Sequence, residues 1–235
     1  MTNKSSKNHI NAPKDLIFAI LASDVVLWTI NEGKLLVRLI PVNVPPHFID
    51  KAGAPGGLIK PSETAEQAAR RLIESKGKVG SGKIYLEQLY TFSEIKRDPR
   101  GRVVAVAYTG IVPWDSLSTT EQENTKEVWW AEIGKLPSLA YDHKEIISTS
   151  LERLQSRIAY TTLIAQFMPK EFTLTELEKA YELILGKDID KRNFRKKILA
   201  LGLLKELPKE RRGQKHRPAK LYSFKSLETK VIEVL

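Results

Sequence analysis

The apolar residues of the N-terminal part of the chain recur in short blocks with the length and spacing of β-strands. The richest block, residues 16–30, is interrupted by the polar pair Ser23 and Asp24, which predicts two strands. Residues 31–33 supply a glycine-containing hairpin turn. Residues 41–57 are rich in proline and glycine, and we expect an irregular loop there. The predicted strands are Leu16–Leu21, Val25–Ile30, Lys34–Ile40, Tyr85–Ser93, Val103–Val112 and Glu127–Ile133.

From Tyr141 onward the pattern changes to helical spacing. Asp142 is a suitable N-cap, and we expect the helix that follows to end before Pro169. One mixed sheet between helices, an α/β/α sandwich, followed by a helical domain is the economical fold of the α/β class. We therefore expect a disordered segment over residues 1–13, the sheet domain over 14–148, a linker helix and second domain over 149–228, and a tail over 229–235.

Composition excludes several classes of function. The hydrophobic fraction of 42% is normal for a globular protein, and no apolar run reaches the roughly 18–20 residues of a membrane span. The polar N-terminus lacks the apolar core of a secretion signal. The absence of cysteine excludes disulfides, thiol catalysis and cysteine-bound metal, and the four histidines show no ligand spacing. These features favour a reducing cytoplasm and predict no metal, no cofactor and no membrane partner.

The formal charge of +10 is concentrated in the C-terminal part of the chain. Residues 1–148 contain 19 basic and 17 acidic side chains, whereas residues 149–235 contain 19 and 11. Within residues 191–220, 12 basic residues are accompanied only by Glu206 and Glu210. Such a local excess favours a polyanionic partner, most often nucleic acid. Anionic lipid is the alternative, but it requires an exposed apolar helix face, and the apolar residues here are expected to pack in a core.

Residues 56–77, GGLIKPSETAEQAARRLIESKG, resemble the Nudix box. That motif is the loop–helix–loop with which Nudix hydrolases bind a divalent metal ion and cleave diphosphates. Gly57, Glu63 and Arg71 fall at the spacing of the motif, whereas its closing glycine, Gly77, comes one residue early. The segment therefore resembles the box in its framework and predicts a Nudix-like sheet domain.

The acidic residues that hold the metal ion in working Nudix enzymes are missing from this segment. Their positions carry Leu72, Ser75 and Lys76, which share one helix face because they stand at i, i+3 and i+4. Leu72 also continues an apolar stripe, so we expect it in the core. The ammonium of Lys76 would repel Mg²⁺, and Glu74 lies about 200° around the helix from position 72. We therefore predict no catalytic residue and no hydrolase activity.

The same segment offers a candidate site for a small-molecule effector. Glu63 and Arg71 are expected to form an ion pair between loop and helix. Lys76 has two interpretations: its charge could replace the metal ion and attract a phosphate, or it is an ordinary solvated lysine. Arg97 is suited to phosphate, with a turn held by Asp98 as the alternative. The candidate effector-binding residues are Glu63, Arg71, Lys76 and Arg97.

The C-terminal part has the order of elements typical of a winged helix–turn–helix. A Thr173–Glu176 capping box opens one helix, Gly186 ends it, and Asp190 caps the next. The second helix carries cations at its N-terminal end, where recognition helices contact bases, and two short strands around a basic tip resemble a wing. A solvated charged face is the alternative. The candidate DNA-binding residues are Lys191, Arg192, Asn193, Arg195 and Lys196 on the helix, and Arg211, Arg212, Lys215 and Arg217 on the wing.

Motifs along nearly the whole chain resemble the family of Nudix-related transcriptional regulators (NrtR-like). They are the runs 172–177, 191–197 and 217–224, and, in the N-terminal part, the run 97–103 and the pair at 142–143. The resemblance implies a degenerate Nudix sensor domain joined to a winged helix, in a dimeric repressor that a ligand releases from DNA. Family effectors are ADP-ribose-type nucleotides, in regulators of NAD metabolism, or sugars, in regulators of sugar utilisation.

Three functions remain open from the sequence. The first is a ligand-responsive regulator that binds a pseudo-palindromic DNA duplex as a homodimer. The second is a hydrolase of ADP-ribose or another nucleoside diphosphate derivative, which would need acids from other strands, such as Glu87, Glu94 or Glu121. The third is a basic RNA-binding or ribosome-associated module. The sequence leaves undecided the effector, the target genes, the operator, and whether the protein represses or activates.

Overall fold

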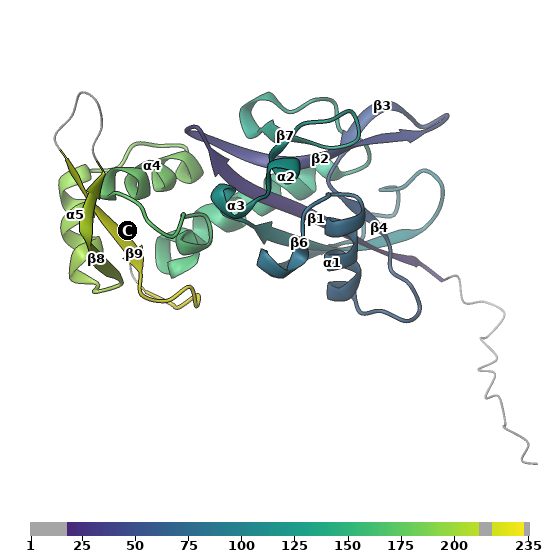
Figure 1. The fold of residues 1–235 in the computed structure, drawn as a ribbon. Coiled ribbons are helices and arrows are strands. Elements are labelled where there is room, and N and C mark those ends of the chain that lie inside the picture. Colours follow the sequence, from purple (N-terminus) through teal and green to yellow (C-terminus); the bar gives the residue numbers. More distant parts are fainter. Residues whose placement is uncertain (1–17, 212–217, 233–235) are drawn as a thin grey trace, which may run out of the picture.

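A mixed β-sheet with helices on both faces is joined by a long helix to a smaller C-terminal domain (Figure 1). The computed structural model describes residues 18–211 and 218–232. The main sheet contains β1 (Ile20–Asn31), β2 (Lys34–Val44), β3 (Phe48–Gly53), β4 (Gly56–Leu58), β5 (Tyr85–Phe92), β6 (Val103–Ile111) and β7 (Trp129–Glu132). Its helices are α1 (Ala65–Ser75), α2 (Thr119–Gln122) and α3 (His143–Tyr160), and the C-terminal domain contains η4 (Thr162–Gln166), α4 (Leu174–Leu185), α5 (Lys191–Ala200), β8 (Leu204–Arg211) and β9 (Ala219–Phe224).

The sheet has the strand order β3-β2-β1-β6-β5, with β4 paired to β1 and β7 to β2. Only the β1–β6 pair is parallel among the described strands, so the sheet is mixed, as predicted. Alternate residues of β1 face opposite sides of the sheet. Val25 and Leu27 pack in the cluster that contains α1, whereas Val26 and Trp28 pack in the cluster that contains α3. This alternation builds the predicted α/β/α sandwich.

The prediction of two strands over residues 16–30 is wrong, because β1 runs without a break from Ile20 to Asn31. Ser23 and Asp24 are buried and continue the strand, since both pair with β6 on one side and with β4 on the other. A carboxylate is tolerated at such a position only when an opposite charge meets it. Arg97 supplies that charge, with its Nη2 atom 3.1 Å from Asp24 Oδ2.

The prediction of an irregular loop over residues 41–57 is also wrong. β2 continues to Val44, and β3 and β4 follow within the same segment. Proline does not prevent this, because residues 40–44 of β2 pair with the edge strand β3 at the end of the sheet, where a missing N–H group is tolerated. Pro45 and Pro46 lie in the turn between the two strands. The hairpin forms one wall of the cavity described below.

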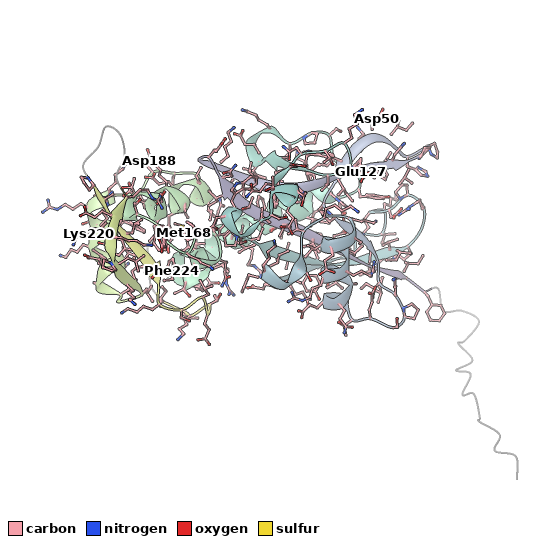
Figure 2. The ribbon with its side chains drawn as sticks, in the orientation of Figure 1. Asp50, Glu127, Met168, Asp188, Lys220 and Phe224 are labelled. Atoms are coloured by element: carbon pink, nitrogen blue, oxygen red, sulfur yellow. The ribbon has the colours of Figure 1, made fainter. Side chains whose placement is uncertain are left out.

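Helix α3 connects the two domains and ends at Tyr160, before Pro169 as predicted. Thr161 is extended, and its side chain accepts a hydrogen bond from Leu163 N, which opens the short helix η4. The predicted domain boundary at residue 148 falls inside α3, and the boundaries stay predictions. The hydrophobic core is continuous across the junction: one cluster includes Trp28 in the sheet and Met168 and Tyr222 in the C-terminal domain. Figure 2 labels Met168 on the side of the C-terminal domain that faces the sheet.

Residues 228–232 form hydrogen bonds with the chain at the junction between α3 and η4. Thr162 N donates to Lys230 O at 3.0 Å, and Ile232 N donates to Tyr160 O at 2.8 Å. The Thr162 hydroxyl donates to Glu228 O at 3.0 Å and accepts from Lys230 N at 2.8 Å. Residues 228–232, at the start of the predicted tail, therefore pass across the end of α3, and we call this segment the strap.

Replacing Thr162 with valine is expected to lower the free energy of unfolding by about 1–3 kcal/mol, because the Lys230 N–H and the Glu228 carbonyl lose the hydroxyl of the buried Thr162 as their partner. Urea unfolding measures the change. Thr119→Val, at an exposed position in α2, is the matched control and should change the value by less than about 0.5 kcal/mol. Equal effects of the two substitutions would contradict the role of the strap.

Candidate effector site and DNA-binding module

An ion pair joins the loop before α1 to the helix itself. Arg71 Nη2 and Nε donate to the two carboxylate oxygens of Glu63 at 2.6 and 2.9 Å. Arg71 also donates to Leu58 O at 3.0 Å, and Glu63 accepts from Lys60 N at 2.8 Å. The hydrogen bonds from Arg71 lower the pKa of Glu63 to about 2. The pair is the loop-to-helix contact expected from the sequence, and its polar groups are engaged within the protein.

The former acidic positions of the box have lost their metal-binding chemistry. Leu72 is only 1% exposed and packs in the interior, as predicted. The Ser75 hydroxyl donates to Arg71 O at 2.7 Å. The acid of the helix nearest these positions, Glu74, accepts hydrogen bonds from the amide and hydroxyl of Ser81 instead. These groups do not fit a divalent cation, and among residues 18–211 and 218–232 no three acidic or histidine side chains converge as a metal site.

Lys76 lies at the end of α1 and its ammonium faces the cavity next to the box. Lys76 Nζ donates to Gly56 O at 2.6 Å. Burial of the ammonium lowers the pKa of Lys76, and the nearby Asp24 carboxylate opposes this effect. Glycine allows the close approach of β4, because a Cβ atom at Gly56 would lie 2.0 Å from Asp24 Oδ1. The ammonium thus lies beside the cavity, and both interpretations of Lys76 stay predictions.

Arg97 is the centre of a buried charge network. Its Nε and Nη2 atoms donate to the two carboxylate oxygens of Asp142 at 2.7 Å each, and Nη2 also reaches Asp24. His143 Nδ1 accepts from Ala54 N at 2.7 Å, and His143 Nε2 lies 4.0 Å from Asp24 Oδ1. Burial lowers the pKa of His143. One guanidinium thus compensates two carboxylates that come from β1 and from the start of α3.

Asp98 stabilises the turn that follows Arg97, as the alternative interpretation of this segment predicted. Asp98 accepts hydrogen bonds from the amide of Arg100 and from its guanidinium, at 2.7–3.0 Å. The Arg100 guanidinium lies 5.5 Å from the centre of the Tyr141 ring. Asp142 is the N-cap residue of α3, as predicted, but its carboxylate makes no capping hydrogen bond and binds Arg97 instead.

These residues surround a cavity of about 590 Å³. Of the four candidate effector residues, the cavity is lined by Lys76 and Arg97, whereas Glu63 and Arg71 are not part of its lining. Asp24, Tyr141 and His143 also line the cavity, although no local sequence pattern predicted them there. Its other wall comes from the end of β2 in the β2–β3 hairpin and is mostly apolar, with Ile40, Val42 and Val44 beside Asn43. The cavity therefore combines an apolar wall with two partly accessible cations, Lys76 and Arg100.

The C-terminal domain has the predicted helices and their predicted caps. Thr173 and Glu176 form a capping box at the start of α4, and Gly186 ends the helix in the left-handed conformation. The Asp190 side chain accepts from Asn193 N at 2.8 Å and caps α5. Phe194 of α5 packs edge-on against Tyr181 of α4 at a distance of 5.1 Å. The two helices are thereby fixed against each other.

The candidate DNA-binding residues of α5 differ in their surroundings. Lys191, Arg192, Asn193 and Lys196 are exposed at the N-terminal half of the helix. Arg195 is partly buried and donates to Glu178 Oε2 through Nε at 3.2 Å. Their DNA contacts stay predictions.

The β8–β9 hairpin lies beside α4 and α5 at the end of the molecule that is remote from the main sheet (Figure 1). Arg211, the last described residue before its tip, forms an ion pair with Glu176. Lys209 lies 2.5 Å from Glu171. The candidates Arg212, Lys215 and Arg217 lie outside the described residues. The strands flank a basic segment, which is the arrangement of a wing.

Comparison with known proteins agrees with this architecture. Residues 164–224 match the model of the NrtR DNA-binding winged helix domain. The chain is 32% identical, over 209 residues, to the ADPR-responsive transcriptional repressor of Acinetobacter baylyi, and the match covers 87% of this chain and 82% of that protein. The chain belongs to the NrtR family. This assignment confirms the resemblance noted in the sequence and the prediction of a DNA-binding transcriptional regulator.

Two solved NrtR structures from Shewanella oneidensis are similar to this chain. NrtR in complex with a 27mer DNA matches with a TM-score of 0.76 and 32% identity, over 87% of this chain and 93% of that chain. The Nudix domain of NrtR in complex with ADP ribose matches with a TM-score of 0.50 and 32% identity, over 61% of this chain and 93% of that chain. The order of a Nudix-like domain followed by a winged helix domain is thus confirmed. No helix within the described residues has the length and apolar character needed to cross a membrane.

Proposed function

We propose that this NrtR-family chain is a transcriptional repressor that binds operator DNA as a homodimer and releases it when ADP-ribose, or a related nucleoside diphosphate sugar, occupies the cavity. The observation that carries the proposal is the Lys76 ammonium, which faces the cavity at a former metal-binding position of the box. The names of the relatives support this choice of ligand, since one is ADPR-responsive and another is solved with ADP ribose.

Charge complementarity supports a diphosphate in particular. The Arg97 charge is neutralised by Asp24 and Asp142, and Arg100 is paired with Asp98. Lys76, by contrast, makes its short contact with a backbone carbonyl, so its charge is available to a phosphate oxygen. The apolar wall of the β2–β3 hairpin would accommodate the less polar part of the ligand.

Helix α3 links the cavity to the DNA-binding domain. The residue before its first turn, Asp142, binds Arg97 in the cavity wall, and its last residue, Tyr160, contacts the strap next to η4. A ligand that favours one position of α3 would shift the separation of the two winged helices in a dimer and so change DNA affinity. We also propose that the protein acts in the cytoplasm, where a regulator of this kind binds its operator DNA.

We also propose that the Nudix-like domain is not a hydrolase. Leu72 is buried hydrocarbon and Lys76 is a cation, so the helix face that holds Mg²⁺ in active Nudix enzymes lacks carboxylates. Incubation with ADP-ribose and Mg²⁺ should give no AMP above background. Turnover that disappears in Glu63→Gln would instead support the alternative function, a hydrolase with an accessory DNA-binding domain.

A direct test of the regulator begins with selection of duplexes from a random-sequence DNA library by the full-length protein. The selected site should be a pseudo-palindrome with half-sites separated by about one helical turn, about 34 Å. Gel shifts with the selected duplex should then show release by ADP-ribose at concentrations where free ribose has no effect. Release by a plain sugar alone would overturn the assignment of the effector class, and a preference for single-stranded RNA would favour the RNA-binding alternative.

Replacing Lys76 with alanine is expected to weaken ADP-ribose binding by about tenfold to a hundredfold, because a charge-assisted hydrogen bond contributes about 1.5–3 kcal/mol. Isothermal titration calorimetry measures the affinity. Lys60→Ala removes an exposed cation from the loop before the same helix and should leave the affinity nearly unchanged. DNA binding without ligand should be unaltered in both variants, since neither residue is in the DNA-binding domain.

A further inference from the structure

Glu178 of α4 is a fully buried carboxylate beneath the cations of α5. Its side chain is 0% exposed. Lys191 Nζ lies 3.2 Å from Oε1, and Arg195 Nη2 lies 3.1 Å from Oε2. Arg195 Nε donates to the same Oε2 at 3.2 Å. One buried anion therefore holds two of the five candidate DNA-binding residues of the predicted recognition helix.

A second contact completes the orientation of Arg195. Its Nη2 atom donates to the Thr175 hydroxyl at 3.0 Å, so Nε and Nη2 are both bound to α4. Within the described part of the chain, no hydrogen bond engages Nη1. The guanidinium is planar and rigid, so fixing two of its nitrogens also fixes the direction of the third. The Arg195 side chain is 42% exposed, so part of it is open to a ligand.

Glu178 differs from the other acids of this domain in its burial. Glu176 pairs with Arg211 and Glu171 pairs with Lys209, but both glutamate side chains are 41% exposed. Ion pairs of that kind are screened by salt and exchange readily with water. A carboxylate without access to water is stable as a charge only while cations pair with it. The contacts of Lys191 and Arg195 with Glu178 should therefore persist, unlike the exposed ion pairs.

We propose that Glu178 is a positioning residue for sequence recognition: it orients Arg195 and anchors Lys191 so that α5 meets DNA with its cations already arranged. The inference rests on the proposed DNA-binding function of α5. An arginine that is held in advance loses less conformational entropy when it contacts a base. The anion also reduces the attraction of α5 for any phosphate backbone, which carries no sequence information. Both effects raise the ratio of specific to non-specific binding.

The test compares wild type with Glu178→Gln, which keeps the shape of the side chain and removes its charge. Affinity is measured for the duplex that wild type selects from a random library and for a scrambled duplex of equal length. The ratio of the two affinities should fall about tenfold in Glu178→Gln, whereas binding to the scrambled duplex should not weaken. Glu210→Gln removes an equal charge from the exposed strand β8 and should leave the ratio unchanged.

Two further variants separate positioning from folding. Thr175→Val removes only the exposed hydroxyl that holds Arg195 Nη2, so it should fold normally and lower the ratio by a smaller factor. In an Arg195→Ala background, Glu178→Gln should lower the ratio much less than in wild type. An unchanged ratio in folded Glu178→Gln and in Thr175→Val would overturn the inference, as would an undiminished effect without Arg195. Failure of wild type to select any duplex would instead refute the proposed function.

Discussion

Replacing Arg97 with alanine is expected to lower the free energy of unfolding by about 3–5 kcal/mol, one of the largest effects of any single substitution in this chain. Arg97 is 9% exposed and is the common partner of two carboxylates, Asp24 and Asp142. Its removal leaves both charges in a poorly solvated site. Thermal unfolding should show a decrease in melting temperature on the order of 10 °C for a chain of this size.

The cause of this loss can be separated from the loss of packing. Lys96→Ala removes the neighbouring cation, which is exposed, and should change stability by less than about 0.5 kcal/mol. Because much of the cost is an unpaired carboxylate, Asp24→Asn should be far less harmful in the Arg97→Ala protein than in wild type. Additive effects of the two substitutions would contradict the charge network.

Local signals predicted the elements whose ends depend on nearby residues. The Thr173–Glu176 capping box, the Asp190 cap and Gly186 set the ends of α4 and α5 through contacts within a few residues, and these contacts are present. The hairpin between β1 and β2 likewise depends on its two turn residues, Glu32 and Gly33, which both have positive φ. Such signals can be interpreted without knowledge of the tertiary structure.

The errors arose where partners distant in sequence decide the structure. Asp24 appeared to interrupt a strand, because its partner Arg97 is 73 residues away. Asp142 is the N-cap as predicted, but its carboxylate binds Arg97, 45 residues earlier, and this contact was not predicted. No local pattern of charge distinguishes a paired carboxylate from a solvated one. The sequence therefore predicted only part of the cavity. The motif indicated Lys76, whereas Asp24 and His143 could be assigned only from the three-dimensional structure.

The same limit applies to the predicted recognition helix. Its charge and its caps were evident from the sequence, but the two candidates that pair with Glu178 could not be told apart from the other three. Arg195 faces Glu178, 17 residues earlier, only because Phe194 packs on Tyr181 and sets the rotation of α5 against α4. The packing of two aromatic rings thus helps to set which cations of α5 face Glu178 of α4.

The exposed cations of α5 are expected to contribute most of its DNA affinity. Arg192 and Lys196 stand at i and i+4, so they lie on one helix face, and both are exposed. The double substitution Arg192→Ala/Lys196→Ala should lower the affinity for the selected duplex by about a hundredfold or more, since each such contact contributes about 1–3 kcal/mol. Fluorescence anisotropy over a range of salt concentrations measures this loss and its electrostatic part.

The salt dependence distinguishes phosphate contacts from base contacts. Each lost phosphate contact reduces the slope of log affinity against log salt concentration by about 0.9, whereas a lost base contact mainly reduces discrimination between sequences. Lys179→Ala removes an exposed cation of α4 and serves as the control, with an expected loss of less than about threefold. If Lys179→Ala weakened binding as much as the double substitution, the DNA would contact α4 rather than α5. The assignment of α5 as the recognition helix would then fail, although the domain would still be a DNA-binding module.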